Sequence, residues 1–195
     1  MLGLACLLAL LAATAFAQEA AAPARPGMRQ LQTTTGLPPS PRDLVDARTT
    51  LKARFREPLS HTDTAVGAIQ AADLLYAAAI NEGDASLKWL MLDESRKLAI
   101  NAGRAEAVSR AITIASATYE FDALALELKS LGQIPLAALD PARATHLAQS
   151  AETLATRAET DGRPDLTEDA LLLAYRSWQR SGNLEAARRT ASRLK

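Results

Sequence analysis

The chain is poor in the residues from which most enzyme sites and disulfide frameworks are built. It has one cysteine, Cys6, and only two histidines, His61 and His146, among 195 residues. A single cysteine excludes an intramolecular disulfide, and neither histidine has a second histidine or a carboxylate four residues on, as a metal-binding helix would. No glycine-rich phosphate loop or serine-centred elbow occurs. We therefore predict that the protein is not an enzyme and has no catalytic, metal-binding or cofactor-binding residue.

An excess of charge of one sign is also missing. The 22 basic and 22 acidic residues give a formal net charge of zero. Proteins that bind nucleic acid usually carry a strongly basic surface. We therefore predict no nucleic-acid partner. Aromatic residues make up only 4% of the chain, so few side chains could serve as large anchors for a partner.

The first 17 residues contain no charged side chain and read as a secretory signal peptide. An apolar stretch, Leu2–Ala13, precedes Ala15-Phe16-Ala17, which has the small-x-small pattern of a cleavage site. Its roughly 16 apolar residues are fewer than the about 20 that span a bilayer, although an uncleaved anchor is the alternative. We predict that the protein is exported, periplasmic or secreted, and that the mature chain lacks both a membrane span and Cys6.

Residues 18–39 are predicted to be a flexible linker. The segment is rich in alanine and proline and has little apolar bulk. Such a composition buries too little surface to offset the entropy lost on ordering. Residues 40–195 are predicted to form a single helical domain, which is long enough to bury a core without disulfides.

Along residues 40–195, apolar side chains recur at the three- and four-residue spacing of amphipathic helices. The clearest series is Ala144, Leu147, Ala148, Ala151, Leu154, Ala155 and Ala158. β-Branched residues are sparse and never alternate over four or more positions, so no β-sheet is predicted. We predict an all-α fold of about eight antiparallel helices in stacked hairpins.

Capping residues, prolines and glycines predict where these helices begin and end. Ser40-Pro41 is predicted to start the first helix and Pro58 to end it. Further N-caps are predicted at Asp63 or Thr64, Asp84, Asp122 and Asp140. Gly83 is predicted to end the second helix in the left-handed conformation that glycine adopts without strain.

An internal repeat is predicted because a shift of 79 residues aligns the turns of the two halves. The aligned pairs are Gly83 with Gly162, Gly103 with Gly182, Leu75 with Leu154, and Glu106 with Glu185. We predict two copies of a three-helix unit, at residues 67–115 and 146–194. Each helix of such a unit can bury its apolar face only against its neighbours.

Two stretches resemble known helical proteins. The sequence GNLEAARRTASRL resembles the turn and second helix of a tetratricopeptide hairpin, with Trp178 near its usual aromatic position. Pro38–Leu131, which includes WLMLDESRKLAINAG, is similar to a helical module of functionally uncharacterised secreted bacterial proteins. These resemblances imply a short α-solenoid outside the cytoplasm, and they carry no catalytic residue.

Helical repeats of this kind usually bind other macromolecules, so we predict a non-catalytic protein–protein interaction module. Its partner would be a peptide or helix of another envelope protein, held in a groove between hairpins. The candidate binding residues are Trp89, Tyr175, Arg176, Trp178 and Arg180. Burial in the core is the alternative for the aromatic residues. One alternative function is a self-associating structural module, which would form a homo-oligomer, and a third is an enzyme whose site is not recognisable.

Overall fold

The computed structural model describes residues 36–194, and within them the fold is all-α. The predicted signal peptide and residues 18–35 of the predicted linker lie outside the described residues. The helices are α1 (Leu44–Arg54), α2 (Arg56–Leu59), α3 (Ala65–Ile80), α4 (Ala85–Asn101), α5 (Ala105–Ser116), α6 (Ala123–Gly132), α7 (Pro141–Thr160), α8 (Pro164–Ser181) and α9 (Leu184–Arg193). A 3₁₀ turn, Leu136–Ala138, precedes α7. Within the described part, no helix is both long enough and apolar enough to cross a bilayer.

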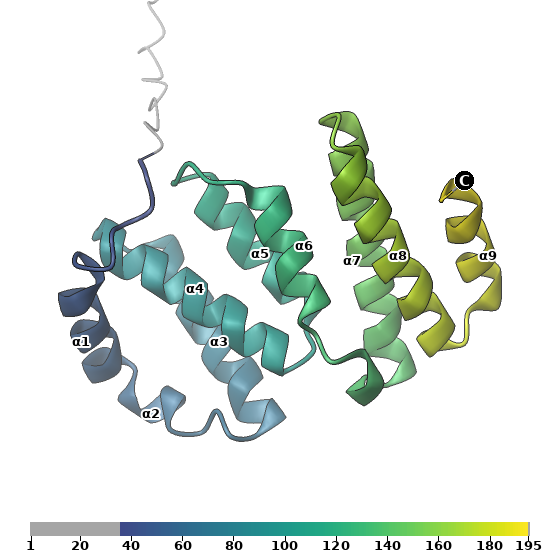
Figure 1. The fold of residues 1–195 in the computed structure, drawn as a ribbon. Helices are drawn as coiled ribbons and strands as arrows, with labels where there is room; N and C mark the ends of the chain where they lie inside the picture. The colour runs from purple at the N-terminus through teal and green to yellow at the C-terminus, as the bar shows by residue number, and fades with distance from the viewer. Residues whose placement is uncertain (1–35, 195) are drawn as a thin grey trace, which may run out of the picture. The chain divides into compact units, whose positions relative to one another are not determined.

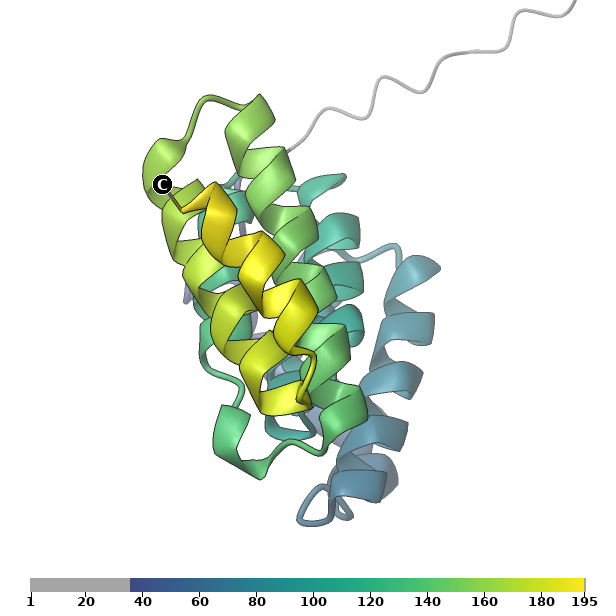
Figure 2. The same ribbon diagram turned by 90° about the vertical axis from the view of Figure 1, so that its right-hand side faces the viewer.

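The helices stack in two layers. Figure 1 shows α4, α6 and α8 in front, with α3, α5 and α7 behind them. Each front helix packs on the back helix that precedes it, and neighbours within a layer also touch. Helices α1 and α2 lie at one end, and α9 packs on α8 at the other, as the end-on view of Figure 2 shows. The predicted all-α fold of stacked hairpins is therefore confirmed.

Most predicted helix starts are confirmed by side-chain caps. The side chains of Thr64, Asp84, Asp122 and Asp140 each accept a hydrogen bond from a backbone N–H three residues on, at 2.8 to 3.0 Å. Such a cap stabilises a helix by about 1 kcal/mol. The N–H of Ala125, together with the Arg163 guanidinium, also holds the pKa of Asp122 below its ordinary value.

The prediction of the first helix is wrong at both ends. The backbone N–H and hydroxyl of Ser40 donate to the Asp43 carboxylate at 3.0 and 2.7 Å, so this turn precedes the helix and α1 begins at Leu44. The helix ends at Arg54, four residues before Pro58, because Phe55 leaves the helical conformation with φ −118°, and Pro58 belongs to α2.

The turn after α3 does not use a left-handed glycine, contrary to the prediction for Gly83. Positive φ occurs at Gly103, Gly162 and Gly182 but not at Gly83. Here the Glu82 carboxylate accepts the backbone N–H groups of Gly83 and Asp84 at 2.9 and 3.0 Å. These two hydrogen bonds close the turn in place of a left-handed cap.

Two large apolar clusters form the core. One joins α1, α3 and α4, and the other joins α5, α6, α7 and α8. Many contact positions are alanine, which lets the helix axes approach closely. Ser95 of α4 is 1% exposed and donates its hydroxyl hydrogen to the Ala72 carbonyl of α3 at 2.8 Å. That hydrogen bond satisfies the one polar group this close contact buries on α4.

Helix boundaries follow the predicted 79-residue spacing in the second and third helices of each unit. Ala85 and Pro164 begin α4 and α8, and Ala105 and Leu184 begin α5 and α9. Both Leu75 and its counterpart Leu154 are fully buried. Helix α6 and the 3₁₀ turn lie between the two units. The type of repeat stays a prediction.

Two of the left-handed glycines give a matched test of packing at a turn. Gly103 has φ 67° and Gly162 has φ 66°, so alanine at either position costs about 1–2 kcal/mol of stability for the left-handed backbone. A Cβ at Gly103 would also lie 2.6 Å from Leu139 Cδ2. A Cβ at Gly162 would have no neighbouring atom within 4 Å. We expect Gly103→Ala to lower the free energy of unfolding by about 1 kcal/mol more than Gly162→Ala does. Equal losses in denaturant titrations would contradict this.

Candidate binding grooves

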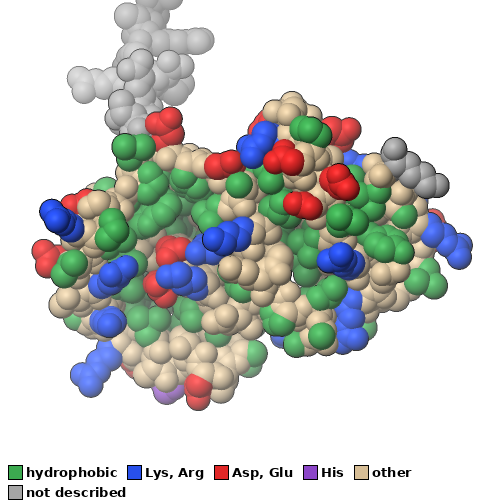
Figure 3. Space-filling model, in the orientation of Figure 1, with side chains coloured by type: hydrophobic (Ala, Val, Ile, Leu, Met, Phe, Trp, Pro, Cys, Tyr) green, Lys and Arg blue, Asp and Glu red, His purple; other side chains and the backbone are tan. Residues whose placement is uncertain are grey.

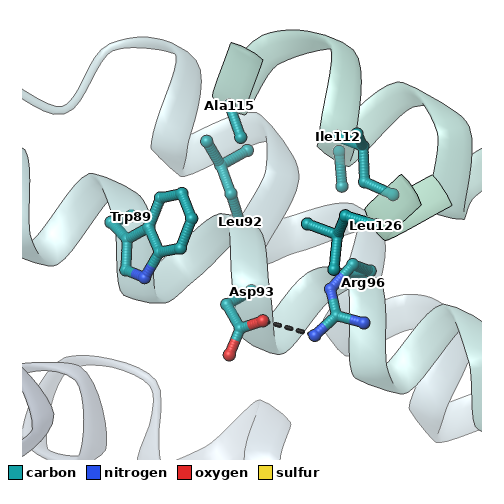
Figure 4. A pocket seen from close by; sticks show the side chains of 8 residues that line it. Trp89, Leu92, Asp93, Arg96, Ile112, Ala115 and Leu126 are labelled. Carbon is teal, nitrogen blue, oxygen red and sulfur yellow. Dashed lines mark hydrogen bonds and ion pairs between the residues drawn. The ribbon is translucent and has the colours of Figure 1, made fainter. Parts of the chain in front are cut away.

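An apolar crevice opens on the front layer between α4 and α6, with α5 as its floor. Figure 4 shows Trp89 at one end and Leu126 on the opposite wall. The floor consists of Ala111, Ile112 and Ala115 of α5, with Leu92 of α4 beside them. In Figure 3, hydrophobic side chains surround a hollow in this region of the front face. The volume open to the centre of a water molecule is only about 10 Å³, so an apolar side chain enters only if the rim moves.

The aromatic end of the crevice is rigidly supported. Trp89 packs edge-on against Tyr119 and Phe121, with ring centroids 5.0 and 5.5 Å away. The Tyr119 hydroxyl donates to the Ala85 carbonyl at 2.5 Å, and burial raises the pKa of Tyr119 to about 12. Tyr119 is therefore a neutral donor at physiological pH, and it ties the end of α5 to the start of α4.

Ion pairs form the polar end. Arg96 contacts Asp93 at 2.5 Å and donates to the Ser130 hydroxyl of α6 at 2.9 Å, while Lys97 contacts Asp93 at 2.7 Å. Burial by itself would raise the pKa of Asp93, but the hydrogen bonds from Lys97 and Arg96 outweigh it and lower this pKa. The stabilisation from Asp93 is therefore present above its ordinary pKa and is lost as the pH falls through its lowered pKa.

Three of the candidate binding residues on α8 are engaged within the fold. Trp178 is only 6% exposed, and its indole N–H donates to the Glu152 carboxylate at 3.0 Å. Tyr175 is half-buried against the same cluster. Arg180 donates to the carbonyl of Leu139 at 2.8 Å. These contacts give all three a structural role.

Arg176 is exposed on α8, and Trp89 lines the crevice on α4. The structure thus does not gather the five candidates at one site. Tyr175, Arg176, Trp178 and Arg180 share α8, whereas Trp89 belongs to a different hairpin.

A second groove, which the sequence reasoning missed, lies in the back layer between α5 and α7. Two adjoining cavities of about 260 and 350 Å³ share Glu106 and His146, which are hydrogen-bonded to each other through the His146 Nδ1. Front-layer helix α6 contributes Glu127, whose side chain is 3% exposed and contacts Arg157 at 2.7 Å. We call this the back groove. Its polar stripes have helical spacing on α5 and α7, but only the packing shows that they face each other.

The two histidines do not converge. His61 lines a cavity with Glu57, Gly67 and Leu74 beside α3, whereas His146 lines the back groove. In the part of the chain that the structure describes, no group of three or more histidine, cysteine or acidic residues is placed to hold a metal ion.

Comparisons of this chain with protein families, with curated proteins and with solved structures find no match.

Proposed function

We propose that the protein is a non-catalytic, extracytoplasmic interaction module whose front layer binds a peptide or helix of another envelope protein. The observation that carries this proposal is the crevice of α4 and α6. It combines a half-buried tryptophan, an apolar floor and a polar end on a rigid helical scaffold. Aromatic side chains in such positions are frequent anchors of protein interfaces.

An unpaired positive charge on one of the wall helices of the crevice favours a partner of one kind. Lys129 on α6, the helix that carries Leu126, is exposed and forms no ion pair with another described residue. Asp93, in contrast, is already paired within the chain. An amphipathic segment that places one apolar side chain over the crevice and acidic residues beside it would complement this surface.

The test is affinity capture from the native envelope, followed by affinity measurement with the retained partner. Trp89→Ala and Lys129→Glu are each expected to weaken binding by about tenfold or more. Arg188→Glu is the matched control, because it makes the same charge change on an exposed position of α9. A Lys129→Glu variant that binds as tightly as Arg188→Glu would exclude the front layer as the interface.

Self-association is the second candidate, because α3 exposes three large apolar side chains. Val66, Leu74 and Ile80 are 66%, 45% and 47% exposed on this helix. Helices with exposed apolar faces commonly pair chain to chain. An oligomer in light scattering, together with no retained partner, would replace the interaction module by this alternative.

A further inference from the structure

The back groove has the chemistry of a ligand site. Its larger cavity is lined by Glu106, Ser109, Thr113, Glu127, His146, Gln149, Ser150, Thr153 and Arg157. No aliphatic side chain and no tryptophan, tyrosine or phenylalanine is among them. Its volume of about 350 Å³ falls within the range of small-molecule and side-chain pockets. An apolar ligand would therefore gain little in this groove, whereas a polar one would find partners on every side.

Two threonine hydroxyl groups in the groove are oriented as acceptors. Thr113 on α5 and Thr153 on α7 each donate their hydroxyl hydrogen to the carbonyl four residues earlier in their own helix, both at 2.9 Å. Their donor capacity is used, so each oxygen offers only lone pairs to the cavity. A ligand that meets these two oxygens must supply hydrogen-bond donors.

Two polar groups deeper in the groove are incompletely satisfied. The Ser109 hydroxyl is buried and has no hydrogen-bond partner within the described residues. Glu127 is 2% exposed, and its Oε2 accepts a hydrogen bond from the Arg157 guanidinium. Its carboxylate accepts no other hydrogen bond from the described residues. A buried polar group without a partner is costly, so a ligand that bonds to it gains correspondingly.

The charge balance of the larger cavity is negative. Two carboxylates, Glu106 and Glu127, line it with a single guanidinium, that of Arg157, which is 45% exposed. The adjoining cavity adds Arg104, and it adds Arg143 in contact with Asp140 at 3.5 Å. Within the larger cavity an anion would meet two like charges, whereas a cation would be attracted.

We propose that the back groove binds a protonated primary amine, either a lysine side chain of a second polypeptide or a free alkylamine. An ammonium group carries one positive charge, three donors and no acceptor. It matches a cavity that offers the Glu127 carboxylate and the two threonine oxygens. This site opens on the back layer, whereas the crevice opens on the front layer. Amine binding here therefore does not depend on the partner that is proposed for the crevice.

The test is titration of the full chain at constant ionic strength with N-acetyl-lysine-N-methylamide, followed by backbone amide shifts in NMR. N-acetyl-norleucine-N-methylamide is the neutral control ligand, and n-butylamine is the free-amine arm. We expect the lysine compound to bind with a dissociation constant of about 1 mM or tighter and the norleucine compound not to bind. Shifts are expected to centre on Ser109, Thr113 and Thr153.

Three variants assign the site. Glu127→Gln removes the charge with little change of shape and should weaken binding at least about tenfold. Thr153→Val removes a hydrogen-bond acceptor at an exposed position and should weaken binding about threefold or more. Because the position is exposed, this variant tests the site even if Glu127→Gln fails to fold. Thr156→Val, which alters an exposed threonine of α7 outside the groove, should leave affinity unchanged.

The remaining outcomes decide the proposal and the source of the amine. Binding of n-butylamine as tight as that of the lysine compound supports a free amine, and binding of the lysine compound alone supports a polypeptide lysine. Equal binding of the norleucine compound, tighter binding of the corresponding arginine compound, or equal losses in Thr153→Val and Thr156→Val would overturn the proposal.

Discussion

We expect Gly67→Ala to lower the free energy of unfolding by about 3 kcal/mol, although alanine is the better helix former. Gly67 is the third residue of α3, and its N–H donates to the Thr64 cap at 3.0 Å. A Cβ at this position would lie 1.8 Å from the His61 carbonyl oxygen and 2.8 Å from its carbon. Because these are backbone atoms, no side-chain rotation relieves the overlap. The turn between α2 and α3 must move as a whole.

Gly83→Ala is the matched control for this prediction. A Cβ there has no neighbour within 4 Å, and its backbone does not have positive φ. We expect that variant to change stability by no more than about 0.5 kcal/mol. Thermal unfolding would show the contrast as a midpoint roughly 6–12 °C lower for Gly67→Ala. If the two variants melt together, the close contact with the His61 carbonyl does not hold in solution.

The clash at Gly67 also shows what the sequence could and could not predict. Apolar periodicity and capping residues are local signals, so Asp84, Asp122 and Asp140 could be placed correctly as caps, and the cap of α3 could be narrowed to Asp63 or Thr64. The close approach of Gly67 to His61 depends on how α2 folds back, which no local pattern encodes. The break at Phe55 was missed for a related reason, since Pro58 is tolerated in the first turn of a new helix.

The binding surfaces were harder to predict than the fold. Trp89 has apolar neighbours in the sequence and Trp178 has polar ones, yet Trp89 lines a crevice and Trp178 fills a contact among α7, α8 and α9. Burial of an aromatic residue depends on which helix covers it. Glu127 lies three residues after Leu124 and four before Leu131, so helical spacing places it on the apolar face of α6. The sequence does not show that Arg157 of α7 pairs with this buried carboxylate, because that contact depends on how α6 and α7 stack.

Trp178→Ala is expected to cost about 4 kcal/mol of stability and to loosen α9. The indole fills a cluster formed with Ala148 of α7 and Ala186 and Ala187 of α9. Its N–H shares the Glu152 carboxylate with the Thr190 hydroxyl, which lies 2.5 Å from that oxygen. Removing the ring opens a cavity at the place where the short last helix is fixed. Hydrogen exchange should therefore be faster along α9 than along α4 in this variant.

Trp178→Phe separates packing from hydrogen bonding at the same position. It keeps most of the apolar contact and leaves Glu152 bonded to Thr190, so we expect a loss of only about 1 kcal/mol. This difference matters for any binding experiment, because an alanine at position 178 would weaken capture of a partner merely by releasing α9. If Trp178 only maintains the fold, Trp178→Phe retains the partner as well as the wild type does. A variant that melts normally but loses the partner would instead place Trp178 at the interface and give the indole N–H a role in binding.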